Sequence, residues 1–209
     1  MTESDFAAYM ELLLNGDHRG CGRIVQDLLA RDVAILEIYQ QLFQRALYLV
    51  GELWAQSQIS VGTEHLATSI TESMLTFIYP KLFASPRTGR RAVVACVGSE
   101  FHQMGARMVA DTLELCGWDA YFLGANTPIE GLLDSLEKKQ PDVLGLSVTI
   151  NSNLVLFQET VEKTRARFPR LEILAGGQAL PHNGARISRD SCLHYLGTLD
   201  DLVAWTCHQ

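Results

Sequence analysis

Glu100 and His102 stand two positions apart in the sequence, directly after the apolar run Ala92–Val97, which has the length of a buried strand. An imidazole displayed at the end of a strand can bind a metal ion, and a nearby carboxylate can fix its tautomer and raise its basicity. Gly105 follows, but the loop lacks the GxGxxG pattern of nicotinamide-binding folds. Taken alone, an ordinary loop histidine is the commoner interpretation of His102.

Small residues end two further expected strands. Ser147 and Thr149 follow one apolar run, and Gly176 and Gly177 follow the next. Because parallel strands end at one edge of a sheet, these residues are expected near His102. Small side chains leave room there for a flat heterocycle, and glycine lets the backbone approach a ligand closely. Each pair considered separately is equally compatible with a plain strand-to-helix turn.

The combination of these three sites is specific. It resembles the DxHxxG, SxL and GG signature of the cobalamin-binding domains of methionine synthases, corrinoid methyl carriers and cobalamin-dependent mutases, over about residues 90–209. The resemblance implies base-off/His-on cobalamin with His102 as the lower ligand of cobalt. The residues implied to line the cofactor site are Glu100, Gly105, Ser147, Thr149, Gly176 and Gly177. Two positions depart from the signature: Glu100 replaces Asp and is one methylene longer, and Thr149 replaces Leu.

A second constellation lies upstream, where Trp54 precedes the pair Glu64-His65. On spacing alone, Trp54 would be a core anchor and the pair would lie in a solvated first helical turn. The helix macrodipole favours a Glu side chain in that turn. Beside a cobalamin domain, the three residues resemble the helical cap of light-dependent, adenosylcobalamin-binding transcriptional regulators. The resemblance implies that they surround the adenosyl group. Ala55 stands where the best-known photoreceptors carry a second His, which leaves His65 as the nearest alternative cobalt ligand in the cap.

The surrounding pattern predicts two domains, 1–87 and 88–209. Up to about residue 85, apolar residues recur at helical spacing in four stretches, the last running from about 62 to 83. After Ser85–Gly89, strands alternate with helices, and a weak helix precedes the last strand. We therefore expect an α + α/β protein, with a four-helix-bundle cap followed by a flavodoxin/Rossmann-like five-stranded parallel sheet. The predicted strands are 92–97, 120–123, 143–148, 171–175 and 194–196.

Composition limits the classes of function. The chain has 209 residues, of which 47% are hydrophobic and 20% charged, which excludes long disorder. The net charge of −7 argues against direct binding of nucleic acid. No apolar run reaches the roughly 18–20 residues of a membrane span, and no signal-peptide pattern is present. Five scattered cysteines fit reduced thiols, so a cytoplasmic protein is expected.

Together these features predict a stand-alone cobalamin sensor without catalytic residues. The resemblance implies a light-responsive adenosylcobalamin photoreceptor that forms homo-oligomers. Because no DNA-reading segment is recognised, its output would pass through a protein partner, either a transcription factor or a signalling protein. The alternative is the corrinoid methyl carrier of a methyltransferase system. Cobalamin storage or delivery is a third possibility.

Overall fold

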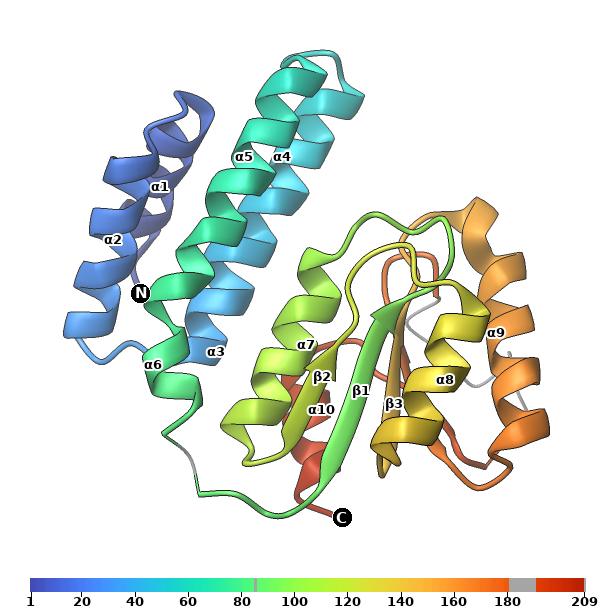
Figure 1. The fold of residues 1–209 in the computed structure, drawn as a ribbon. Helices are drawn as coiled ribbons and strands as arrows, with labels where there is room; N and C mark the ends of the chain where they lie inside the picture. Colours follow the sequence, from blue (N-terminus) through green and yellow to red (C-terminus); the bar gives the residue numbers. More distant parts are fainter. Residues whose placement is uncertain (85, 181–190, 209) are drawn as a thin grey trace. The chain divides into compact units, whose positions relative to one another are not determined.

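The computed structural model describes residues 1–84, 86–180 and 191–208. The chain divides into two compact units, Met1–Lys81 and Leu82–Gln209, and each is described by itself (Figure 1). The sequence pattern placed the boundary after residue 87. In the structure, the amide of Thr88 donates to the carbonyl of Gly117 at 2.8 Å, which ties the segment before the first strand to the second unit.

The first unit is a bundle of helices, as the apolar periodicity predicted. Buried apolar side chains from the longer helices form its core, among them Tyr9, Leu13, Val25, Leu28 and Ile70. The elements are α1 (Glu3–Leu14), α2 (His18–Ala30), α3 (Ile35–Glu37), the π-helix η1 (Ile38–Gln44), α4 (Arg45–Ala55), α5 (Val61–Met74), the 3-10 helix η2 (Leu75–Phe77) and α6 (Tyr79–Leu82).

The π-helical stretch η1 follows from the spacing of the buried residues. Ile38, Leu42, Ala46 and Val50 are all buried and recur every four residues. An α-helix has 3.6 residues per turn, so such a stripe would drift around its surface. Within η1 the slower turn of a π-helix offsets this drift between Ile38 and Leu42, whereas Ala46 and Val50 lie in α4. The sequence pattern predicted the helix but not this underwound segment.

The last predicted helix of the bundle is wrong in its length. A single helix to about residue 83 was expected, but α5 ends at Met74 and is followed by η2 and α6. Pro80 gives the physical reason. Proline has no amide hydrogen, and its ring would clash with the carbonyl of Thr76 in a continuous helix.

The second unit is the predicted five-stranded parallel sheet with its covering helices. Its elements are β1 (Arg91–Cys96), α7 (Met104–Leu115), β2 (Asp119–Phe122), α8 (Ile129–Lys139), β3 (Val143–Ser147), the 3-10 helix η3 (Asn151–Asn153), α9 (Leu154–Arg167), β4 (Glu172–Gly176), β5 (Leu193–Tyr195) and α10 (Leu199–Thr206). Each strand lies within one residue of its predicted bounds. The expected weak helix between β4 and β5 falls largely on 181–190, outside the described residues.

The strand order is β2-β1-β3-β4-β5, with every neighbouring pair parallel. Helices α8 and α9 cover one face and α7 and α10 the other, each over its own apolar core (Figure 1). The chain leaves β1 toward β2 and then returns to β3 on the opposite side of β1. The direction of the chain thus changes between β1 and β3, and in such sheets ligands bind beyond the carboxyl ends of the strands at a change of this kind.

Membrane insertion through helices has no support in this fold. Among residues 1–84, 86–180 and 191–208, no helix combines the length and the apolar character that crossing a bilayer requires.

Candidate functional site

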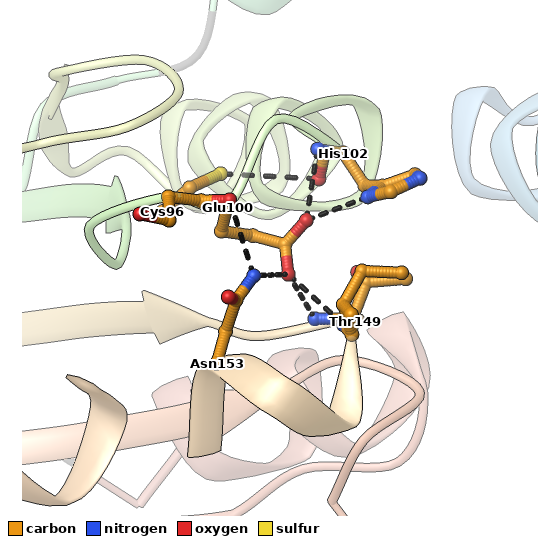
Figure 2. Close-up of polar contacts among 7 residues, drawn as sticks. Cys96, Glu100, His102, Thr149 and Asn153 are labelled. Atoms are coloured by element: carbon orange, nitrogen blue, oxygen red, sulfur yellow. Dashed lines mark hydrogen bonds and ion pairs between the residues drawn. The ribbon is translucent and has the colours of Figure 1, made fainter. Parts of the chain in front are cut away.

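The carboxylate of Glu100 is the centre of a hydrogen-bonded group at the ends of β1 and β3. Its side chain is 0% exposed. Oε1 accepts from the backbone amide of His102 at 3.0 Å and from its ring Nδ1 at 2.6 Å. Oε2 accepts from the amides of Thr149 at 2.8 Å and Ile150 at 3.0 Å, and from the side-chain amide of Asn153 at 3.1 Å. Figure 2 shows the carboxylate between His102 on one side and Thr149 and Asn153 on the other.

These bonds decide the charge of the group. Burial by itself raises the pKa of Glu100, but the backbone donors Ile150, His102 and Thr149 and the ring of His102 outweigh it. The resulting pKa is about 2, against an ordinary value of 4.5. Glu100 is therefore an anion at neutral pH, stabilised by N–H donors.

The anion also fixes the tautomer of His102. A carboxylate can only accept, so ring Nδ1 carries the hydrogen of this contact, and Nε2 is the ring atom that remains for a metal ion. The His102 side chain is 57% exposed, in contrast to its buried partner. A neutral imidazole held in this manner is a metal ligand with a prepared orientation.

Register between neighbouring strands brings the two loops of this group together. Cys96 pairs with Ser147 across β1 and β3, so both strands end at the same level. The thiol of Cys96 donates to the carbonyl of His102 at 3.8 Å. Burial, and then the charge of Glu100, raise the pKa of this thiol to about 12, so it remains protonated.

The predicted small residues lie at the same edge of the sheet. Ser147 and Gly176 are partners in register on β3 and β4. Gly177 has φ +111, and a Cβ there would lie 2.1 Å from the carbonyl oxygen of Val148. Gly105, in the first turn of α7, has open space around the corresponding position. Glycine at 177 is therefore required by the fold, whereas Gly105 leaves unfilled space.

The predicted cap residues lie near the loop between α4 and α5 in the helical unit. Trp54 is 50% exposed, so the interpretation as a core anchor is wrong. Glu64 accepts from the hydroxyl of Thr68 at 3.1 Å, and its Oε2 is 3.5 Å from Nε2 of His65. The His65 side chain is 71% exposed. An aromatic surface, a carboxylate and an imidazole are thus displayed on one helical hairpin.

Asn153 is a member of the Glu100 group that the sequence analysis missed. It stands at the N-cap of α9 but makes no capping bond with its side chain. That side chain donates instead to Glu100 and, at 3.2 Å, to the carbonyl of Ser99. An Asn before a predicted helix is normally assigned to capping, and nothing in the local sequence distinguishes the two uses.

Known proteins are similar to both units. A family model described as "B12 binding domain" matches residues 90–194, and a second model of that description matches residues 6–79. The transcriptional repressors CarH and CarA of Myxococcus xanthus are each 30% identical to the chain, over 69% and 87% of it. The chain spans 48% of CarH and 60% of CarA.

A solved structure is similar along the whole chain. The monomethylamine corrinoid protein of Methanosarcina barkeri aligns with a TM-score of 0.85. The alignment covers 100% of this chain and 99% of that one, at 14% sequence identity. At that identity the likeness concerns the fold.

The low pKa of Glu100 predicts a pH-dependent contribution to stability. Its folded pKa of about 2 lies below the ordinary 4.5, so the contribution is complete above pH 4.5 and is lost as the pH falls toward 2. We expect Glu100→Gln to lower the free energy of unfolding by about 3 kcal/mol at neutral pH, and by much less near pH 3. Urea unfolding of both proteins at the two pH values measures this, and an equal loss at both would contradict it.

The surroundings of Gly177 predict that adding a single methyl group there strongly lowers the free energy of unfolding. Gly177→Ala combines a positive φ with a clash against backbone, and we expect a loss of at least ~2–3 kcal/mol in unfolding free energy. Gly176→Ala is the matched control, because among the described residues its Cβ would meet only the carbonyl of Leu196, at 3.5 Å. Thermal unfolding of the two variants should differ clearly, and similar midpoints would show that the loop relaxes around the methyl group.

Proposed function

Because this chain belongs to the B12 binding domain family, we propose that it is a corrinoid methyl carrier that holds cobalamin base-off through His102. The observation that carries the ligation is the contact of 2.6 Å between His102 Nδ1 and the buried anion of Glu100. This contact leaves Nε2 as the coordinating atom on an exposed side chain. When bound, cobalamin would supply a cobalt–carbon bond that can be made and broken.

The residues of the sheet unit fit such a group. Imidazole nitrogen is a suitable ligand for a transition metal of intermediate softness. The open space at Gly105 and the small side chain of Ser147 leave room beside the ligand. Glu100 holds the proton at Nδ1 and keeps the ring in one orientation, as the second shell does for metal-bound histidines.

The coverage of the structural alignment favours the carrier. The alignment with the monomethylamine corrinoid protein includes the residues of both units and 99% of that protein. A carrier needs no nucleophile or general acid of its own, since its partners perform the transfers. In this proposal, two methyltransferases are the partners, and the chain is a non-catalytic component of their system.

A regulatory function is the second candidate, and the set Trp54, Glu64 and His65 favours it, with Trp54 and His65 exposed and Glu64 partly buried. These side chains could pack on an adenosyl group and accept hydrogen bonds from its hydroxyls. CarH and CarA, both at 30% identity, are described as transcriptional repressors. In this proposal, the adenosyl group would supply the sensitivity to light, and a change in self-association would carry the signal to a protein partner.

His102→Ala tests the ligation. We expect cobalamin affinity to fall at least about tenfold, since loss of a group that merely supports a ligating histidine already has an effect of that size at other metal sites. The spectrum of histidine-ligated cobalt should also disappear. His208→Ala is the control, because that ring bonds only the carbonyl of Ala204 among the partners seen in the described residues. Absorption spectra of the loaded proteins decide, and an unchanged His102→Ala spectrum would refute the assignment.

Competition between methyl- and adenosylcobalamin separates the two functions. A carrier should bind both forms with similar affinity and keep its mass in solution under green light. A regulator should prefer the adenosyl form, lose that preference in Trp54→Ala, and change its mass on illumination. Tyr48→Ala is the matched control, since this aromatic residue of α4 is 46% exposed and outside the set. If Trp54→Ala still preferred adenosylcobalamin over methylcobalamin, Trp54 would no longer support the regulatory function.

A further inference from the structure

The loop that carries Glu100 is held by two asparagine side chains from neighbouring loops. Ser99 precedes Glu100 and has φ +62, a left-handed conformation that is uncommon for a residue other than glycine. Its amide donates to Oδ1 of Asn126 at 2.8 Å. Its carbonyl accepts from Nδ2 of Asn153 at 3.2 Å. Both polar groups of the Ser99 backbone are therefore bonded by side chains from outside the loop.

Asn126 makes a second contact with the same loop. Its own backbone amide donates to the carbonyl of Glu100 at 2.8 Å. Asn126 thus binds the chain on both sides of the Ser99–Glu100 peptide, once with its side chain and once with its backbone. It also has a left-handed φ of +47, a conformation that asparagine tolerates better than most residues.

An unfavourable backbone conformation persists only where its surroundings determine it. Here the determinant on the β2 side is the Asn126 side chain, and the determinant on the β3 side is Asn153. The direction in which the chain leaves Ser99 sets where the Glu100 carboxylate lies. That carboxylate in turn holds the ring of His102 at 2.6 Å.

We propose that Asn126 is a positioning residue for His102, acting through the left-handed Ser99 and the Glu100 carboxylate. This inference rests on the proposed ligation of cobalt by His102. The loop after β2 thereby contributes to metal binding, although the Asn126 side chain contacts Ser99 and not the imidazole.

Three substitutions separate the contributions of Asn126. Asn126→Gly keeps the left-handed backbone and the amide donated to Glu100, and removes only the side-chain acceptor. Asn126→Asp keeps both the acceptor oxygen and the tolerance of a left-handed φ. Asn126→Ala removes the acceptor and adds backbone strain, so it measures the two effects together.

The first measurement uses the full chain without cofactor. Hydrogen exchange of the Ser99 amide should be faster in Asn126→Gly than in the wild type, and restored in Asn126→Asp. Equal exchange in the wild type and Asn126→Gly would overturn the proposed clamp. Because no cobalamin is present, this result does not depend on the proposed function.

The second measurement uses cob(II)alamin as the probe. We expect Asn126→Gly to bind about two- to tenfold more weakly, the effect of one lost hydrogen bond. The share of cobalt that shows nitrogen coupling from isotope-labelled histidine in its paramagnetic resonance spectrum should also fall, and Asn126→Asp should restore both. A merely structural role would lower the midpoint of thermal unfolding and leave that share unchanged, which would overturn the proposal.

The two failures are distinguishable. If the wild type binds no cobalamin, or binds it without coupling from histidine, the proposed ligation fails while amide exchange still reports on the clamp. If the wild type is ligated by His102 and Asn126→Gly matches it in both readouts, the positioning inference alone fails. Should Asn126→Gly not fold, an Asn126→Asp protein with exchange and coupling unlike the wild type would overturn the inference.

Discussion

A buried carboxylate stays ionised only where hydrogen-bond donors stabilise its charge, and this requirement organises the sheet unit. Glu100 is fully buried and accepts bonds from the loops after β1 and β3. Removing one partner of such a group costs more than the bond itself, because the charge remains in a medium that solvates it poorly. The two loops are consequently tied to one another through a single side chain, and the orientation of His102 is a product of that tie.

The topology explains why so few residues suffice. The return of the chain across β1 places the ends of β1 and β3 next to each other, at the same level in register. Backbone amides of Thr149 and Ile150 then face the carboxylate without any side chain being needed. The Glu100 carboxylate thus contacts these amides with one oxygen and the imidazole with the other.

Much of this arrangement could be predicted from the sequence. Apolar runs located β1, β3 and β4, because strands buried on both faces are continuous in composition. The partly exposed β2 and β5 were predicted from shorter runs. The small residues and the Glu100–His102 pair could be found through their spacing. The parts that could not be predicted depend on contacts distant in sequence. Asn153 donates to Glu100 instead of capping α9, and the backbone of the left-handed Ser99 is bonded by two asparagines on other loops. The end of α5 well before Pro80 shows that apolar periodicity overestimates a helix when a proline lies within its last turns.

The underwound stretch Ile38–Gln44 has a consequence for how this fold can vary among its relatives. Such a stretch is equivalent to an extra residue accommodated within an α-helix. Loss of one residue there would restore ordinary winding and leave everything beyond it on nearly the same side of the helix, because the wider turn of a π-helix takes up the added residue. Loss of a residue from the ordinarily wound α4 would instead rotate everything beyond it by about 100° around the helix axis. Trp54, at the far end of α4, would therefore keep its side of the helix through a one-residue deletion in Ile38–Gln44, and alignments of related chains should be inspected for gaps at this point.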